Sequence, residues 1–549
     1  MSDSDITFVT GATGFIGHYV LAALLRRGAS CTAIVRSGAS GRVRLHRLLR
    51  EIDEQRRDTS TIDRPHARTL HEAELVTVEG SLPDDLPDLR DRRVGRIVHL
   101  AADTRFAERD GEPFRTNVEG TRRLLGWADA HDVRDLTLVS TAFVCGRRRG
   151  TVLEEEPCTV IGAAAAPAKR HCDIGVHNAY EASKQQAEEL CRAWARQPGR
   201  RLTIARPGVV AGDSATGRAT AFRGFYVVAR AVELLSRALH DAPRSARHAV
   251  TLRMPGRSDN PNYLVPVDFA AEAVAHLAMD HQQPGGVYHL TPPRPATQGD
   301  IQRWLEFYFD LGGGRFVGRR TPHPSQYTPH EAMFHDGARS VVGYFKDAPR
   351  FDTRRANAVL GAAGIACPII DGDYVHRLLR FAQRVHWGRR VHPAAAATAS
   401  DPESARGAVA ARRAADELFA AYFERFLPEH LPRSTIARMT PVRATMRFVI
   451  DGTPDGEWVC RFDAGRLTCL SRGPNGLSEE FGYRATPQAF WEAVGGQVEG
   501  EALFMSQQAD VFGDVEKALK MSAILREFTR EFPCDPPRLM KYMSHLPPA

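Results

Sequence analysis

Residues 7–17 read Thr-Phe-Val-Thr-Gly-Ala-Thr-Gly-Phe-Ile-Gly. An apolar strand runs directly into Gly11, Gly14 and Gly17, and a helical pattern follows over residues 19–25. Glycine at such a turn lets backbone N–H groups approach a phosphate, and the N-terminus of the next helix favours negative charge. A glycine triplet in this strand–helix context predicts a dinucleotide-binding turn at the start of an α/β domain.

The spacing of these glycines narrows the kind of turn. It is Gly-x-x-Gly-x-x-Gly and, with Thr10 and Thr13, resembles the TGATGFIG turn of the extended short-chain dehydrogenase/reductase family. The resemblance implies a Rossmann-type doubly wound parallel sheet and hydride transfer with a nicotinamide cofactor. Strands and helices alternate from residue 6 to about 215, and this alternation also predicts a parallel sheet.

A tyrosine and a lysine stand four residues apart in Tyr180-Glu181-Ala182-Ser183-Lys184. Residues at this spacing share one helix face, so the phenol and the ammonium point the same way. The ammonium is expected to lower the pKa of the tyrosine from its usual ~10. The family resemblance implies that Tyr180 is the proton donor and that Lys184 binds the nicotinamide ribose.

Two further catalytic positions follow from the same resemblance. The predicted strand at 136–139 leads into residues 140–146, which resemble the strand end that carries the family's catalytic Ser or Thr. Aligning the terminal glycine assigns this role to Thr141, with Ser140 as the alternative. Asn117 stands where the family has an asparagine that helps to organise the site.

Other segments resemble those that line the cofactor in the family. The glycine turn would hold the pyrophosphate, and strand ends would contact the adenosine and the nicotinamide. The family usually has an aspartate where Ser81 stands, and a serine accepts a hydrogen bond from the adenine amine only weakly. The cofactor-binding candidates are Gly11, Thr13, Gly14, Phe15, Ile16, Gly17, Arg36, Arg44, Ser81, Leu82, Ala101, Ala102, Tyr180, Lys184, Pro207, Gly208, Val209 and Val210.

The residue after the second predicted strand, 31–35, indicates which nicotinamide is used. An acid there would bind the ribose 2′-OH of NAD, whereas arginine suits the 2′-phosphate of NADP, and this position is Arg36. Arg42, Arg44 and Arg47 follow, but the chain has 73 Lys and Arg, so nearby arginines carry less weight. NADP(H) is therefore the predicted cofactor, and no metal is expected.

The bulk composition excludes several classes of protein. A chain of 549 residues exceeds one hydrophobic core, so two or more domains are expected. The net charge of +7 is mild for this length, and no basic run interleaves with aromatics, so nucleic acid is not indicated as a partner. No run of ~18 apolar residues predicts a transmembrane segment.

The N-terminus lacks the features of a signal peptide. Nine cysteines form no Cys-x-x-Cys pair, which favours free thiols in a reducing compartment. We therefore expect a cytoplasmic protein.

Three regions follow from the sequence pattern. Residues 1–391 are expected to form the reductase domain, with a substrate lobe largely over 216–391. Residues 263–270 resemble the family's "VPVD" element at the start of that lobe, and the segment from Phe345 to Leu379 resembles the tail of thioester-reductase-like and fatty-acyl-reductase-like members. Small residues and prolines predict a linker at 392–406.

A different pattern begins after the linker, over 407–549. An amphipathic helix is predicted at 408–427, followed by short strands, a helix opened by Thr486-Pro487 and a Gly-Asp turn before the last helix. This order resembles the sterol-carrier-protein-2 (SCP2) fold, an α+β domain with an apolar tunnel for lipids. The alternative is a dimerisation or scaffold module in which the aromatic residues are simply core.

Together the resemblances imply an NADPH-dependent reductase that converts an acyl thioester to an aldehyde, while the C-terminal domain binds the lipid chain. The substrate would be carried by CoA or by an acyl carrier protein. One alternative is an NADP(H)-dependent alcohol/ketone oxidoreductase acting on a sterol or other free lipid. Another is a lipid carrier whose reductase half does not turn over. The oligomeric state is left open.

Overall fold

The structure is a computed structural model. It describes residues 5–36, 39–59, 75–155, 175–319, 322–347, 349–388, 416–434, 443–451, 453, 456–463, 466–473, 479–496 and 509–543. The linker predicted at 392–406 lies outside the described residues.

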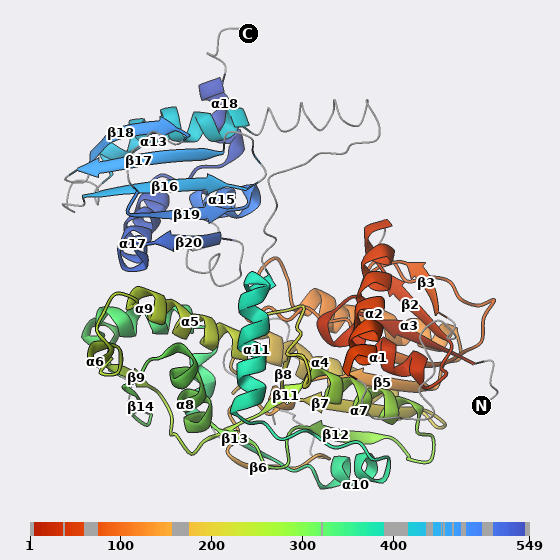
Figure 1. Ribbon diagram of the computed structural model, residues 1–549. Helices are drawn as coiled ribbons and strands as arrows, with labels where there is room; N and C mark the ends of the chain where they lie inside the picture. Colours follow the sequence, from red (N-terminus) through yellow and green to blue (C-terminus); the bar gives the residue numbers. More distant parts are fainter. Residues whose placement is uncertain are drawn as a thin grey trace.

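A seven-stranded parallel sheet forms the centre of the first domain (Figure 1). Its order is β12-β7-β5-β4-β1-β2-β3, so strands are added in opposite directions on either side of the β1–β4 pair. This is the predicted doubly wound arrangement, and it places a ligand crevice at the carboxyl ends of β1 and β4. The strands are β1 (Ile6–Thr10), β2 (Cys31–Val35), β3 (Leu75–Glu79), β4 (Val94–His99), β5 (Asp135–Val139), β7 (Arg201–Pro207) and β12 (Gly286–Leu290).

Helices cover both faces of this sheet because successive strand residues point to opposite sides. Phe8 of β1 packs into a cluster with α3 and α4, whereas its neighbour Val9 packs into a cluster with α1, α2, α7 and α10. Burial of two apolar faces explains the nearly continuous apolar strands. The helices are α1 (Phe15–Arg26), α2 (Ala39–Thr59), α3 (Gly120–Ala130), α4 (Ala179–Trp194), α7 (Val267–Met279) and α10 (Arg354–Ala362).

The substrate lobe is smaller than the predicted range of 216–391. Helix α7 packs against α1, and β12 pairs in parallel with β7, so residues 267–290 return to the nucleotide-binding sheet. The sequences of α7, which is rich in alanine, and of β12, which is an apolar edge strand, are compatible with either the nucleotide-binding sheet or a separate lobe. Only the residues that α7 and β12 pack against decide between these two positions.

The substrate lobe has its own apolar core, built by α5, α8, α9 and α11 with short strands β9 and β14. These are α5 (Phe225–Ala238), α8 (Gln298–Phe309), α9 (Pro329–Gly337), α11 (Gly372–Arg384), β9 (Leu252–Met254) and β14 (Gly314–Phe316). The shorter elements are η2 (Arg115–Glu119), η3 (Ala142–Cys145), β6 (Gly150–Val152), β8 (Val209–Ala211), α6 (Arg244–Arg247), β10 (Pro261–Asn262), β11 (Leu264–Pro266), β13 (Ala296–Thr297), η5 (Pro324–Gln326), η6 (Val342–Lys346), β15 (Pro349–Phe351) and η7 (His386–Gly388).

The C-terminal domain contains a separate five-stranded sheet of order β18-β17-β16-β19-β20. The predicted aromatic helix is present over its described part and covers the sheet: the Phe423 ring stacks on Trp458 with centroids 4.6 Å apart. The side chains of Thr486 and Asp514 cap α15 and α17. The elements are η8 (Ala421–Phe426), α13 (Leu427–His430), η9 (Leu431–Arg433), β16 (Ala444–Ile450), β17 (Glu457–Asp463), β18 (Arg466–Arg472), β19 (Phe481–Ala485), α15 (Pro487–Val494), β20 (Ala509–Gly513), α17 (Val515–Glu531) and α18 (Pro536–Met543).

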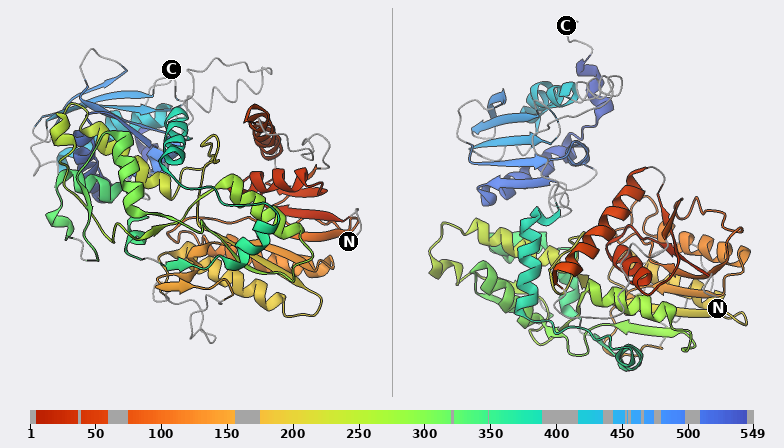
Figure 2. Two further views of the ribbon diagram at one scale, coloured as in Figure 1. Left: turned by 60° about the horizontal axis from the view of Figure 1, so that its bottom comes forward. Right: turned by 45° about the vertical axis from the view of Figure 1, so that its right-hand side comes forward.

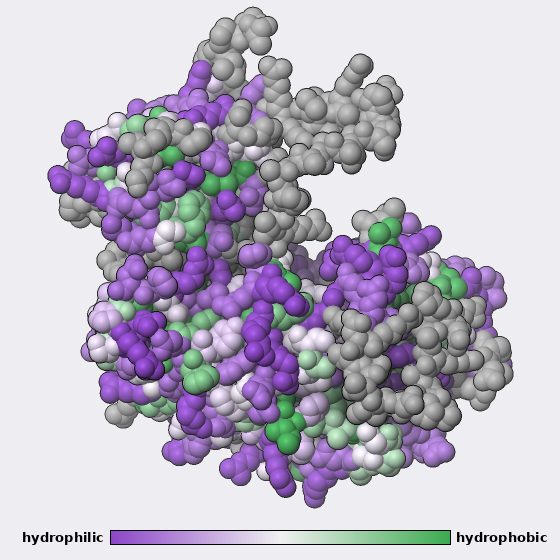
Figure 3. Space-filling view, in the orientation of Figure 1, coloured by the Kyte–Doolittle hydropathy of each residue, from purple (hydrophilic) through white to green (hydrophobic). Residues whose placement is uncertain are grey.

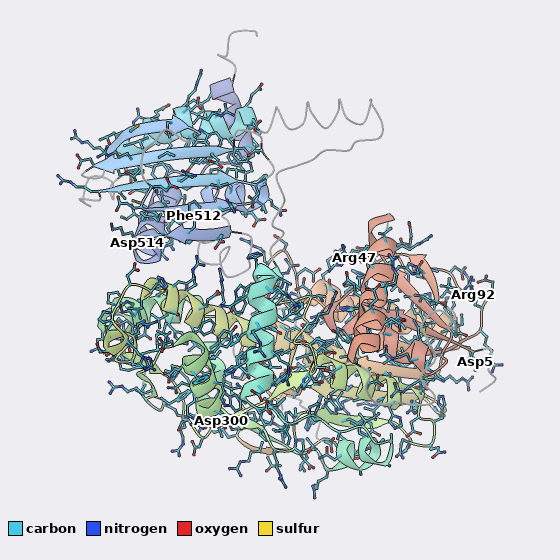
Figure 4. All side chains as sticks on the ribbon, in the orientation of Figure 1. Asp5, Arg47, Arg92, Asp300, Phe512 and Asp514 are labelled. Carbon is cyan, nitrogen blue, oxygen red and sulfur yellow. The ribbon has the colours of Figure 1, made fainter. Side chains whose placement is uncertain are left out.

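The C-terminal domain rests on the substrate lobe through α5 and α9 (Figures 1 and 2). Leu234 of α5 and Met333 of α9 belong to the same apolar cluster as the core of the C-terminal domain. An Arg230 guanidinium nitrogen lies 3.6 Å from an Asp510 carboxylate oxygen of β20. Phe512 of β20 and Asp514, which caps α17, lie on the side of the domain that faces the substrate lobe (Figure 4).

The face of the molecule seen in Figure 3 is mostly hydrophilic, with apolar side chains in separate spots. Within the described part of the chain, we find no helix with the length and apolar character to cross a membrane.

Candidate active site

The glycine turn packs against the end of β4. Gly11 has φ +73°, and a Cβ on it would lie 2.4 Å from the Ala101 nitrogen, so any side chain there would force the two segments apart. A Cβ at Gly14 would lie 3.1 Å from the Gly11 carbonyl oxygen. Gly14 also leaves α1 without a side-chain cap, and Phe15, Ile16 and Gly17 form its first turn. This open helix N-terminus fits a pyrophosphate.

A buried chain of hydrogen bonds supports the turn from behind. Thr10 Oγ1 and His99 Nδ1 are 2.7 Å apart, and His99 Nε2 lies 3.1 Å from Thr121 Oγ1. Burial, together with the nearby Lys184 charge, lowers the pKa of His99 to about 3, so the imidazole is neutral. The Ala101 N–H donates to Thr10 Oγ1 (3.2 Å), which fixes the strand end against the turn. None of these links was predicted from the sequence.

Asn117 ties the loop after β4 to helix α4. The side-chain oxygen Oδ1 of Asn117 accepts from the Asp103 N–H (2.7 Å). Its side-chain nitrogen Nδ2 donates to the Asp103 backbone carbonyl and to Ser183 Oγ, both at 2.8 Å. The side chain is almost fully buried, so these three bonds use most of its capacity. Asn117 therefore acts on the site by positioning the loop and α4.

Helix α4 brings Lys184 to the end of β5. The Lys184 ammonium donates to the Val139 carbonyl oxygen at 2.8 Å, directly before Ser140 and Thr141 in the chain. Burial lowers the pKa of Lys184 to about 8. Tyr180, one turn earlier on the same helix, is half-buried, and its ring lies 6.4 Å from that of Phe106.

The expected effect of Lys184 on Tyr180 is not found. Burial, reinforced by the Glu181 carboxylate, raises the pKa of Tyr180 above its ordinary value. The i, i+4 spacing fixes the helix face, but the Lys184 ammonium bonds the Val139 carbonyl instead.

The structure separates Thr141 from Ser140. The Thr141 hydroxyl accepts from the Phe143 N–H at 3.2 Å and leaves its own proton free to be donated elsewhere. The Ser140 hydroxyl instead interacts with Glu188. Burial alone would raise the pKa of Glu188, but Arg206 and the Ser140 hydroxyl hold it below its usual range. This arrangement favours Thr141 for contact with a substrate.

A buried ion pair joins α4 to β7. Arg206 Nε and Nη2 donate to Glu188 Oε1 (2.9 Å) and Oε2 (2.6 Å), and both side chains are almost fully buried. The pair fixes α4 relative to the sheet and thereby the depth of Lys184. The sequence contained no signal for it beyond the Arg206-Pro207 strand end.

The arginines expected near the 2′-phosphate lie at the edge of the crevice. Arg36 follows β2 and is exposed, and Arg44 is exposed on α2. Burial lowers the pKa of His18 to about 4, with the charges of Arg218 and Arg44 contributing, so Arg44 lies near the first helix. Arg47, labelled on α2 in Figure 4, pairs with Glu51 at 3.7 Å.

The remaining cofactor candidates lie in loops and at strand ends beside the crevice. The Ser81 N–H donates to the Asp85 carbonyl (2.6 Å), and Leu82 packs against Gly120 at the start of α3. Ala102 follows β4, and Thr13 lies in the glycine turn. Pro207 ends β7, and β8, which begins after Gly208 with Val209 and Val210, pairs with β11.

Sequence reasoning missed an aromatic wall beside Tyr180. The Tyr344 ring stacks on His177 at 4.3 Å and lies 5.3 Å from Phe143 and 6.1 Å from Phe106. Tyr344 also donates to the buried Glu181 carboxylate. Glu181 stands inside the Tyr-x-x-x-Lys motif and could have been noticed, but Tyr344 is far away in the chain and only folding brings it here.

Comparisons with known protein families match two separate parts of the chain. Residues 9–274 match the family described as "Male sterility protein", which binds NAD, and residues 423–526 match the SCP-2 sterol transfer family. Among solved structures, the terminal R domain from the myxalamid PKS-NRPS biosynthetic pathway has a TM-score of 0.53 at 24% identity. It covers 71% of this chain and 92% of its own, and at this identity it shows a shared fold.

Two curated relatives are similar over the first domain. Aldehyde reductase lnaA of Aspergillus flavus is 24% identical over 68% of this chain and 36% of its own length. Isonitrile lipopeptide synthase of Streptomyces coeruleorubidus is 27% identical over 68% of this chain and 24% of its own length. The chain therefore spans about a third or less of these relatives.

Proposed function

Because the chain joins an NAD(P)-binding reductase domain of the thioester-reductase-like group to an SCP2 domain, we propose that it reduces an acyl thioester to an aldehyde with NADPH. The observation that carries this proposal is the meeting of α4 with the end of β5: Lys184 bonds the Val139 carbonyl, two residues before Thr141, and lies one helical turn after Tyr180. One relative is named an aldehyde reductase, and another is a lipopeptide synthase.

NADPH, when bound, supplies a hydride to the thioester carbonyl carbon. The Thr141 hydroxyl donates to the carbonyl oxygen, and Tyr180 delivers its proton there as negative charge develops. Lys184, held by the Val139 carbonyl, would bind the nicotinamide ribose. The hemithioacetal then collapses: its O–H proton returns to Tyr180, the C–S bond breaks, and the departing thiolate takes a proton from solvent. One thioester, one NADPH and one proton give one aldehyde, one thiol and one NADP⁺.

NADPH rather than NADH is proposed because of the charge around the adenosine ribose. Arg36 follows β2, the position that meets the 2′-substituent, and its guanidinium is exposed. Arg44 adds a second positive charge on α2, near the first helix. A 2′-phosphate would bind both arginines through charge-assisted hydrogen bonds.

The C-terminal domain is proposed to bind the aliphatic part of the substrate. Its apolar core is continuous with Leu234 and Met333 of the substrate lobe, which supports transfer of a chain between the two. CoA and an acyl carrier protein would both present such a chain as a thioester.

The proposal is tested by incubating the protein with NADPH and a long-chain acyl-CoA. Thiol release, read with Ellman's reagent, is expected to equal NADPH consumption. NADPH consumption with a sterol ketone and no thiol release would instead support an alcohol/ketone oxidoreductase. Tight lipid binding without NADPH consumption on either substrate would support a carrier.

The role of the C-terminal domain is tested by comparing the full chain with residues 1–391. We expect KM for long-chain thioesters to rise in the shortened chain and KM for short ones to stay the same, because tethering raises the local concentration of a bound lipid to about millimolar. An equal loss of activity on all substrates, or a change in oligomeric state, would assign the domain a structural role.

A further inference from the structure

An apolar pocket lies within the substrate lobe, apart from the catalytic side chains. It lies between α5, α8, β9 and β14. Val228, Val232 and Leu235 form the α5 wall, and Ile301 and Leu305 form the α8 wall. Val228 is half-buried, whereas the other four are buried, so the pocket deepens from Val228 inward.

The polar groups of the pocket are already bonded to protein. Gln302 Nε2 donates to Glu306 Oε1 (3.0 Å) and to the Gly314 carbonyl (2.7 Å). Glu306 Oε1 also accepts from the Gly314 N–H at 2.9 Å, and Gln298 Oε1 accepts from Asn262 Nδ2 at 3.3 Å. Burying a polar ligand against groups paired in this way would cost free energy, whereas an aliphatic chain gains from the apolar walls.

One side of the pocket adjoins the candidate active site. Phe345 lines the pocket, and its neighbour Tyr344 belongs to the aromatic wall beside Tyr180. The short helix η6 therefore faces both spaces.

The other side adjoins the C-terminal domain. Helix α5 presents Val232 and Leu235 to the pocket and Leu234 to the core of the C-terminal domain. Helix α9 does the same with Phe334 and Met333. Two helices thus separate the pocket from the proposed lipid-binding core.

We infer that this pocket binds the end of one aliphatic chain, that of the lipid-like acyl substrate. The inference deepens the proposed function and rests on it for the identity of the chain. It adds a second chain-binding site to the protein, distinct from the C-terminal domain and placed between that domain and Tyr180.

The experiment uses the full chain and a fatty acid with a photoreactive diazirine near its end. After irradiation, mass spectrometry of peptides is expected to find label in α5 and α8 as well as in the C-terminal domain. Val228→Trp should reduce the label in α5 and α8 by about tenfold or more. The indole would keep about two methylene groups of the aliphatic chain out of the pocket, and the lost burial of two methylene groups weakens binding by about that factor. Arg303→Trp, on the exposed face of α8, is the matched control and should keep the label.

Val232→Trp serves as a second variant, and a thermal transition that NADPH raises shows that each variant is folded. The inference would be overturned if the wild-type protein carried no label in α5 and α8. It would also be overturned if Val228→Trp and Val232→Trp were labelled there as strongly as the control variant Arg303→Trp. Thiol release by wild-type protein is measured in parallel. Thiol release without this label contradicts the pocket alone, and label without thiol release contradicts the proposed function alone.

Discussion

Breaking the buried Glu188–Arg206 pair should destabilise the reductase domain far more than replacing both residues. Arg206 is fully buried, and Arg206→Met would leave the Glu188 carboxylate with only Arg192, 3.6 Å away, as a charged partner among the contacts in the structure. Removing one member of such a pair costs ~3–5 kcal/mol. With an unfolding entropy of about 2.1 cal/mol/K per residue, this loss lowers the unfolding temperature of a domain of ~390 residues by about 4–6 °C.

The double variant Arg206→Met/Glu188→Leu removes both charges of the pair and should recover most of this loss, because apolar replacement of a buried pair is often neutral. Thermal unfolding with and without NADPH is the assay, since the transition that NADPH raises belongs to the nucleotide-binding domain. The reasoning is refuted if the single variant unfolds within about 2 °C of wild type, or if the double variant is no more stable than the single.

Three further predictions concern the chemistry. Tyr180→Phe should lower turnover by ~10²-fold or more with NADPH affinity nearly unchanged; near-normal turnover would remove Tyr180 from its role. Arg36→Ala should raise the dissociation constant of NADPH and leave that of NADH nearly unchanged. Equal dissociation constants for NADPH and NADH in the wild-type protein would contradict this prediction. Because burial lowers the pKa of Lys184 to about 8, its ammonium is present below that pH and lost above it. Measured kcat/KM for NADPH should therefore fall as pH rises through about 8, and a flat profile to pH ~10 would exclude Lys184 as the controlling group.

Local patterns were sufficient for much of the fold. The strand before Gly11, the Tyr180–Lys184 helix and the Thr486 and Asp514 caps are encoded within a few residues, and the structure contains each of them. The doubly wound sheet followed from the alternation of strands and helices.

What the sequence did not predict depends on contacts between distant segments. Tyr344 reaches Glu181 only when the substrate lobe folds onto α4. The return of α7 to the nucleotide-binding sheet is likewise decided by its packing against α1. The direction of the pKa shift of Tyr180 could not be predicted from the sequence. Helical spacing indicates that Lys184 is on the same helix face as Tyr180, but it does not indicate that the Lys184 ammonium bonds the Val139 carbonyl.

The central claim, hydride transfer to the carbonyl carbon of a thioester, is tested most directly with NADPH carrying deuterium at C4. Wild-type protein and a long-chain acyl-CoA are incubated in two parallel reactions, each with one equivalent of one of the two C4-labelled forms of NADPH. The aldehyde is trapped and analysed by mass spectrometry. We predict one deuterium at the aldehyde carbon from one of the two forms, with one thiol released for each. Deuterium on an alcohol carbon of a sterol or ketone substrate, with no thiol released from the acyl-CoA, would contradict the account.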